Sequence, residues 1–105
     1  MIAGRIRHTV AFTLAHPAGS AEERNFLEAA ERHVAIPGVE AFELLAGVSP
    51  KNGYRFGISM EFADRAAYEG YNEHPDHVGF VQERWLAEVT DFLELDYVAA
   101  SFASP

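Results

Sequence analysis

Hydrophobic and polar side chains alternate along four stretches of the chain. The alternation is strongest in residues 54–62 and clear in residues 6–14, whereas it is less regular in residues 39–48. A last stretch, at about residues 91–98, carries apolar side chains on both parities. A period of two places successive side chains on opposite faces of an extended chain, so these four stretches are predicted β-strands.

Two helical segments are predicted between these strands. The first begins after Ser20, because a serine followed three residues later by Glu23 is a capping box, and it ends before a Pro-Gly pair. The second begins after Asp64 and is broken at Pro75, which lacks an N–H donor and restricts the residue before it. We therefore expect an α+β fold of the ferredoxin-like βαββαβ type, with an antiparallel four-stranded sheet, in a single domain spanning residues 1–105.

The last predicted strand also predicts the assembly. Leu93, Leu95 and Tyr97 lie on one of its faces, while Phe92 and Val98 lie on the other. A two-layer monomer covers only one face of its sheet with helices, so the other face would stay in water. We therefore expect a homodimer in which two copies pack sheet against sheet.

The composition excludes several classes of partner. Sixteen acidic residues against eight basic ones give a formal net charge of -8, so neither nucleic-acid binding nor attachment to an anionic membrane is expected. The N-terminal residues lack a long apolar segment, and we expect a cytoplasmic protein. The absence of cysteine excludes disulfides and thiolate metal sites. Residues 101–105 are expected to form a loose tail.

The densest group of reactive side chains lies between Tyr71 and Phe80. His77 is expected in the first turn of the helix that follows Pro75, where free N–H groups favour a neutral imidazole. Such a ring, with a pKa of about 6.5, is suited to general-base work at neutral pH. The alternative is a structural role, in which His77 caps its own helix and hydrogen-bonds to Tyr71.

The remaining histidines have simpler expected roles. His8 has apolar neighbours on its own parity and should be buried and neutral. Because the first and last strands of this fold lie side by side, Asp96, or less favourably Glu94, is its expected partner. His16 and His33 fall in a loop and at a helix end, where solvated positions are expected.

The chain offers three imidazoles as possible metal ligands, because three such groups can hold catalytic zinc. They belong to His8, His74 and His77. However, a residue held extended by Pro75 does not share a helical face with His77. We therefore expect neither a metal nor any other cofactor.

Four features together resemble the stress-responsive dimeric α/β-barrel (Dabb) family. They are His8, Ile36-Pro37-Gly38-Val39, the segment from His74 to Phe80, and Leu95-Asp96-Tyr97. The resemblance implies a dimeric ferredoxin-like barrel, in a family where many members have no established activity. Its best understood enzyme is the plant olivetolic acid cyclase, which closes a polyketide ring by aldol chemistry without a cofactor.

The resemblance also implies site residues. His77 corresponds to the general base of the cyclase, Tyr71 to its hydrogen-bonding partner, and His8 to the first-strand histidine. The cyclase has an apolar residue where this chain has Glu94. The pocket-lining positions are Val10, Phe26, Phe42, Ile58, Val78, Phe80 and Glu94.

Three functions remain open at this point. The chain is expected to be a homodimeric family member with a pocket beside His77 for a small β-keto or phenolic ligand, without an assigned activity. The first alternative is a cofactor-free polyketide cyclase-like cyclase or lyase with His77 as general base. The second is a monooxygenase of the antibiotic-biosynthesis type, which shares the dimeric barrel.

Overall fold

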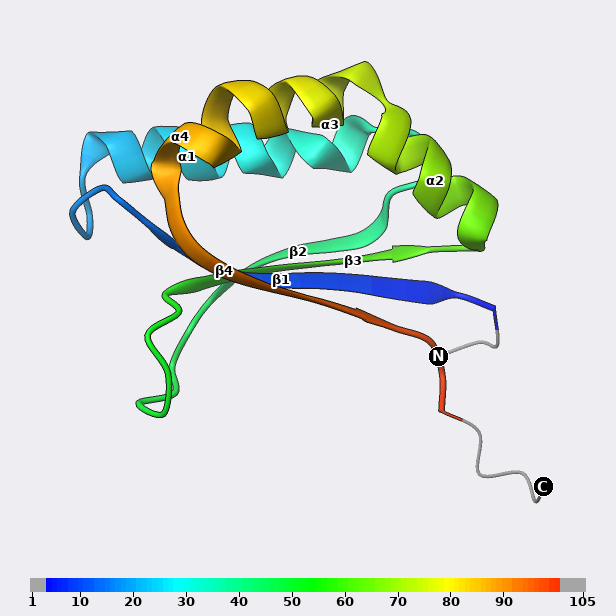
Figure 1. Ribbon diagram of the computed structural model, residues 1–105, viewed down its shortest axis with the longest axis horizontal. Helices are drawn as coiled ribbons and strands as arrows, with labels where there is room; N and C mark the ends of the chain where they lie inside the picture. Colours follow the sequence, from blue (N-terminus) through cyan, green and yellow to red (C-terminus); the bar gives the residue numbers. More distant parts are fainter. Residues whose placement is uncertain (1–3, 101–105) are drawn as a thin grey trace.

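The computed structural model describes residues 4–100, and the expected tail at residues 101–105 lies outside them. Four antiparallel strands form one sheet in the spatial order β2-β3-β1-β4 (Figure 1). The strands are β1 (Ile6–Leu14), β2 (Glu40–Ala46), β3 (Phe56–Phe62) and β4 (Val89–Tyr97). Because β1 pairs with both β3 and β4, the first and last strands lie side by side. This arrangement confirms the predicted ferredoxin-like α+β fold.

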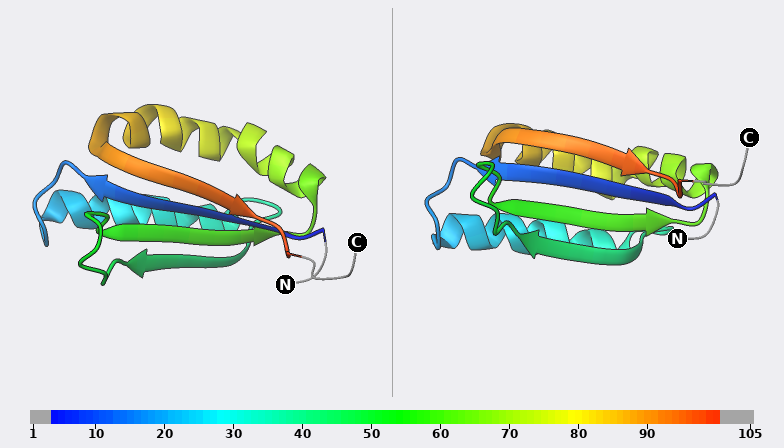
Figure 2. Two further views of the ribbon diagram at one scale, coloured as in Figure 1. Left: turned by 60° about the horizontal axis from the view of Figure 1, so that its bottom comes forward. Right: turned by 90° about the horizontal axis from the view of Figure 1, so that it is seen from below.

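All helical segments cover the same face of this sheet (Figures 1 and 2). They are α1 (Ala21–Glu31), the 3₁₀ turn η1 (Arg32–Ala35), α2 (Arg65–Glu73), α3 (Pro75–Phe80), the π-helical turn η2 (Val81–Trp85) and α4 (Leu86–Glu88). In the described range, no helix combines the length and the apolar character needed to cross a bilayer.

The predicted helix starts are confirmed by their caps. The Ser20 hydroxyl accepts a hydrogen bond from the Glu23 N–H at 3.1 Å, and Asp64 caps α2 in the same way. The predicted break is also present, since α2 ends before His74 and α3 begins at Pro75. His74 Nδ1 accepts the Asp76 N–H at 3.1 Å, which satisfies one of the free donors of α3.

Two strand boundaries differ from the predictions. The third strand begins at Phe56 rather than at residue 54, and the last begins at Val89 rather than at about residue 91. Val89 instead pairs with Leu14, so contact with the neighbouring strand overrides the local spacing. The irregular pattern of β2 also has a structural cause, because its register shifts near Ala41, whose φ is 49°.

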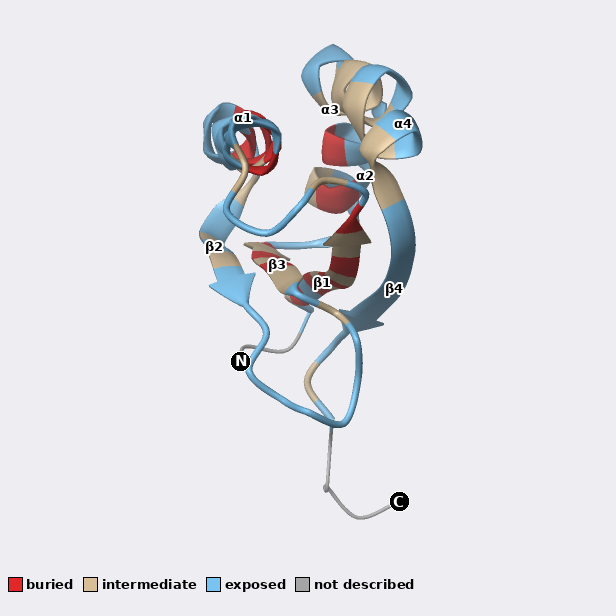
Figure 3. Ribbon diagram, turned by 90° about the vertical axis from the view of Figure 1, so that its left-hand side faces the viewer, coloured by how far each residue is buried: buried red, intermediate tan, exposed pale blue. Residues whose placement is uncertain are grey.

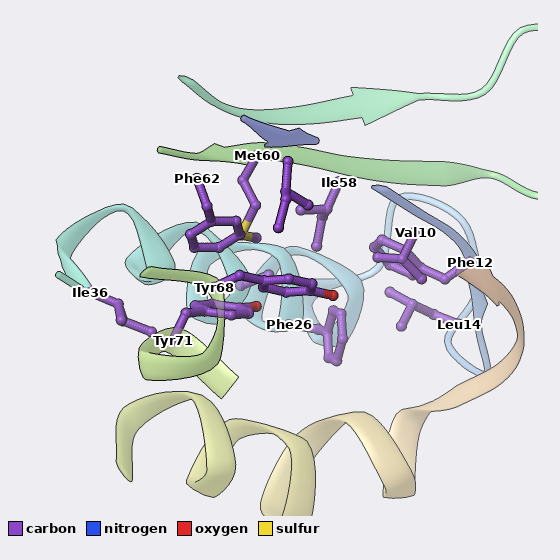
Figure 4. Close-up of a cluster of buried hydrophobic side chains, with 12 residues drawn as sticks. Val10, Phe12, Leu14, Phe26, Ile36, Ile58, Met60, Phe62, Tyr68 and Tyr71 are labelled. Carbon is purple, nitrogen blue, oxygen red and sulfur yellow. The ribbon is translucent and has the colours of Figure 1, made fainter. Parts of the chain in front are cut away.

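The hydrophobic core lies between the sheet and the helices (Figure 4). Its largest fully buried side chains are Phe12, Phe26, Phe62 and Met60. Tyr68 and Tyr71 extend from α2 into the same layer. The edge strand β4 differs from β1 and β3, because it is exposed over most of its length (Figure 3).

Candidate functional site

A cavity of about 250 Å³ lies between the sheet and the helices that follow α2. Its walls are formed by His8, Val10, His33, Ile58, Met60, Tyr71, Asn72, His77, Phe80, Val81, Trp85, Leu86, Phe92 and Glu94. Two of these, Val81 and Trp85, come from the π-helical turn η2. Such turns are rare and occur frequently at functional sites.

His8, Asp96 and Tyr68 form one hydrogen-bonded group at the cavity, which we call the sheet network. His8 and Asp96 are opposite each other in the β1–β4 pairing, and His8 Nδ1 lies 2.6 Å from Asp96 Oδ1. The Tyr68 hydroxyl donates to Asp96 Oδ2 at 2.6 Å. The expected partner of His8 is therefore confirmed as Asp96.

The sheet network fixes the tautomer of His8. A carboxylate oxygen accepts the hydrogen bond here, so His8 Nδ1 is the donor, and in the neutral ring Nε2 has the free lone pair. Among the described residues, no buried side-chain nitrogen or oxygen lacks a partner. His8 Nε2 has no protein partner there and must therefore reach accessible space, which for this buried ring is the cavity.

His33 and His77 form a second group with the carbonyl of Ala30, which we call the helix network. His33 Nδ1 donates to the Ala30 carbonyl oxygen at 2.9 Å, so its Nε2 is an acceptor. That nitrogen lies 3.2 Å from His77 Nδ1, which must therefore be the donor. As in His8, the nitrogen left for a ligand is the unprotonated Nε2 of His77.

Burial keeps both rings of the helix network neutral. Loss of solvation, together with charge repulsion from the neighbouring His33 and His8, lowers the pKa of His77 to about 4. Burial is also the main cause of the lowered pKa of His33. Burial, rather than the helix N-terminus, therefore favours the neutral form of His77, and a pKa of about 4 makes it a weaker base than its sequence position suggested.

Tyr71 lies between the two networks. Its ring centroid is 4.2 Å from that of His77 and 6.0 Å from that of His8. Within residues 4–100 its hydroxyl makes no hydrogen bond to His77, so the expected bond is replaced by ring packing. Burial, followed by the charges of Tyr68 and Glu94, raises the pKa of Tyr71 well above its usual range. The phenol therefore stays protonated and can donate to a ligand.

Some of the expected lining residues lie elsewhere. Val10, Ile58, Phe80 and Glu94 do line the cavity, as do His8, Tyr71 and His77. Those outside its walls are Phe26, Phe42 and Val78.

Each of these three has a physical reason for its position. Phe26 is fully buried in the core, behind Phe80 and Trp85. Phe42 packs against the core from β2, at the opposite edge of the sheet from β4. Val78 follows His77 directly, and one residue turns its side chain by about 100° around the helix axis.

The other histidines also need correction. His33 is buried rather than solvated, and His16 Nε2 bonds to Glu88 at 2.7 Å. His33 was missed by the sequence analysis, although it follows Ala30 by three residues and Phe26 by seven. That spacing places it on the inner stripe of the first helix.

The three possible metal ligands His8, His74 and His77 do not line one site. His74 caps α3 and is not part of the cavity wall. A different set has suitable spacing, since one ligand atom each of His8, Glu94 and Asp96 lies within 4.8 Å of the others. Both Asp96 oxygens are already hydrogen-bonded to the sheet network. His8 and Asp96 thus already have hydrogen-bond partners within the protein, and only the Glu94 carboxylate has none among the described residues.

Several solved structures share this fold. A Dabb family protein from Mesorhizobium loti is 57% identical, with a TM-score of 0.92 over 93% of this chain and 99% of that chain. A dimeric ferredoxin-like protein of unknown function from Thermobifida fusca has a TM-score of 0.75 at 18% identity, over 90% of this chain and 91% of that one. The hydroxynitrile lyase of Passiflora edulis has a TM-score of 0.82 at 14% identity, over 99% and 100%.

At such low identity, the last two similarities establish only the fold. No curated protein matches the sequence. The family model of the stress responsive A/B barrel domain (Dabb) matches residues 6–99, which is most of the chain. The chain therefore belongs to the Dabb family.

Proposed function

We propose that this protein is a cofactor-independent enzyme of the cyclase or lyase type, which moves a proton on a small carbonyl compound bound in the cavity. The observation that carries the proposal is the sheet network. A base held in one tautomer by a third group is the arrangement by which proteins activate proton transfer. Here Asp96 orients His8 and compensates the charge that its imidazole gains with a proton.

The proposed reaction uses two side chains. His8 Nε2 accepts a proton from a carbon next to a carbonyl group, and the C–H electron pair becomes part of an enolate. The protonated Tyr71 hydroxyl donates a hydrogen bond to the enolate oxygen. In a ring closure, the enolate carbon bonds to a second carbonyl carbon of the same molecule, whose oxygen takes up the proton from His8.

His77 has a different role in this proposal. With a pKa of about 4, it holds a proton too weakly to serve as the main base at neutral pH. It is nevertheless neutral and fixed by His33, so its Nε2 can accept a hydrogen bond from the substrate. We thus assign His77 to substrate binding and His8 to proton transfer.

Hydrogen exchange tests the proposed catalysis directly. The enzyme is incubated in D₂O with a panel of aryl ketones and β-keto esters, and loss of the α-proton signal is followed by NMR. We expect saturable exchange above the buffer rate, and a decrease of about 10²–10⁴-fold in His8→Gln. His16→Gln is the control, since His16 bonds to Glu88 outside the cavity. Saturable binding without exchange would overturn the catalytic role.

Binding without turnover is the second candidate function. It is favoured by the low pKa of His77 and by the fact that His8 already has the partners a structural histidine needs. The same experiment separates the two functions. In this case ligands would shift the histidine ring signals saturably, while the α-proton signal would decay at the buffer rate.

We also propose that the protein is a homodimer formed through the outer face of the sheet. Leu93, Leu95 and Tyr97 are 44–49% exposed on β4, although they are large and apolar. Similar folds from Bacteroides fragilis and Thermobifida fusca are described as dimeric. A second copy that covers these side chains would remove them from water.

Light scattering after size-exclusion chromatography tests the dimer. We expect Leu95→Arg to elute as a monomer at micromolar concentration, because a charge would be buried in the interface. The control is Val34→Arg, since Val34 is 56% exposed on the helical side of the molecule. If both variants keep the mass of a dimer, the outer sheet face is not the interface.

A further inference from the structure

Three of the polar groups that line the cavity act as hydrogen-bond acceptors. From the two networks, His8 Nε2 and His77 Nε2 are both unprotonated acceptors. The Glu94 carboxylate adds a third accepting group. The donors are the Tyr71 hydroxyl, the Asn72 amide and the Trp85 indole N–H, and the first two of these can also accept.

The charge of the cavity is also one-sided. Its walls, formed entirely by described residues, contain Glu94 but neither lysine nor arginine. Glu94 lies two residues before Asp96 on β4, and both have a carboxylate oxygen within 4.8 Å of a ring nitrogen of His8. The charge of Glu94 also reaches Tyr71, where it adds to the pKa increase caused mainly by burial and by Tyr68. The cavity is therefore a site of negative potential.

Glu94 has no partner of its own in the described part of the chain. Asp96, by contrast, accepts hydrogen bonds from His8 and Tyr68. The Glu94 carboxylate is therefore the group that has interaction capacity left for a ligand. Its position opposite Val10 in the β1–β4 pairing places it on the helical side of the sheet, which is the side of the cavity.

The apolar part of the wall contains several aromatic rings. Phe80, Trp85 and Phe92 line the cavity together with Tyr71, and the rings of Trp85 and Phe92 meet edge to face at 5.6 Å. The face of an aromatic ring attracts a cation. An anion would instead lose its hydration without meeting a positive side chain, which costs free energy.

We propose that the cavity selects hydrophobic ligands that donate hydrogen bonds and carry no negative charge, and that Glu94 makes a protonated amine the preferred head group. This inference rests on the proposed function, because it assigns a substrate class to the same cavity. An ammonium group donates to Glu94 and to a neutral imidazole at once. A hydroxyl group satisfies the acceptors only in part, and a carboxylate is repelled.

Three ligands with the same ring test this ranking: benzylamine, benzyl alcohol and benzoate. Trp85 is the single tryptophan of the chain and lines the cavity, so its fluorescence reports binding. At neutral pH we expect the dissociation constant to rise from the amine to the alcohol to the carboxylate. In Glu94→Gln, the preference for the amine over benzoate should fall about two- to fivefold, because Glu94 is an exposed residue of β4 whose charge is partly screened by solvent.

Glu43→Gln is the matched control, because it removes the same charge from an exposed position on β2 outside the cavity. It should leave the ranking unchanged, and an equal effect of both variants would show that overall charge, not Glu94, decides. Tighter binding of benzoate than of benzylamine in the wild type would overturn the inference but leave the proton-transfer function standing. Failure of all three ligands to bind saturably would also overturn the inference, whereas the proton-transfer function is decided by the hydrogen-exchange experiment.

Discussion

The two histidine networks reach the same tautomer by different means. In the sheet network, a carboxylate on a neighbouring strand accepts the Nδ1 proton of His8. In the helix network, the acceptor for His77 is another neutral ring, which is fixed in turn by the Ala30 carbonyl. Any acceptor can fix a tautomer, but only a charged one compensates a positive imidazolium.

This difference separates the two rings chemically. Burial, followed by charge repulsion from His33 and His8, lowers the pKa of His77 to about 4. His8 instead has the Asp96 carboxylate 2.6 Å from its Nδ1. Two imidazoles that line one cavity can therefore serve as a proton acceptor and as a hydrogen-bond acceptor, respectively.

The largest expected effect comes from converting the partner of His8 into a neutral group. Asp96→Asn keeps the shape of the side chain but removes the charge, and its amide can donate to Nδ1 and thereby reverse the tautomer of His8. We expect α-proton exchange to fall by about 10²-fold or more. Nitrogen NMR of the ring should show the proton moving to Nε2.

Asp91→Asn is the control for this change. Asp91 lies on the same strand, is exposed, and is paired with Thr13 rather than with a histidine. It should leave both the exchange rate and the tautomer of His8 unchanged. If Asp96→Asn reverses the tautomer but keeps the exchange rate, the sheet network does not provide the base.

A smaller effect, on stability, is expected from the helix network. His33→Ala removes the acceptor of the His77 N–H and leaves space next to the Phe80 ring, which packs edge to face on His33 at 4.7 Å. We expect a loss of about 1–3 kcal/mol in the free energy of unfolding, measured in urea. The exposed neighbour substitution Arg32→Ala should cost less than about 0.5 kcal/mol. Equal losses would show that the His33–His77 bond contributes nothing.

The pairing of His8 with Asp96 in the sheet network was predictable from the sequence because strands have a fixed period, whereas the contribution of Tyr68 from α2 was not. Once the first and last strands are paired antiparallel, parity alone places His8 and Asp96 on one face. The capping residues Ser20 and Asp64 act locally, so they also marked their helix starts correctly. These features depend on short-range patterns and on one topological rule.

The helix network was not predictable in the same way. The contact between His33 and His77 depends on how η1 and α3 approach each other across the layer, and no spacing in the sequence encodes that distance. The π-helical turn that supplies Trp85 to the cavity has no sequence signature either. Strand pairing could therefore be predicted from the sequence, whereas the long-range packing of helices could not.

The last expected effect is a pH dependence of stability that arises in the helix network. Above about pH 6.5, His77 is neutral in both the folded and the unfolded chain. As the pH falls from there to about 4, only the unfolded chain binds the proton, because folding lowers the pKa of His77 from 6.5 to about 4. The contribution of His77 to stability is thus fully present above this pH window and is lost as the pH falls through it.

The variant His77→Gln tests this pH dependence, because its amide can still donate to His33 but does not titrate. The difference in unfolding free energy between wild type and His77→Gln should therefore shrink steadily from pH 7 to pH 4, with carboxylate effects common to both. A constant difference would mean that His77 is not desolvated in the folded protein, and the contrast between the two networks would disappear.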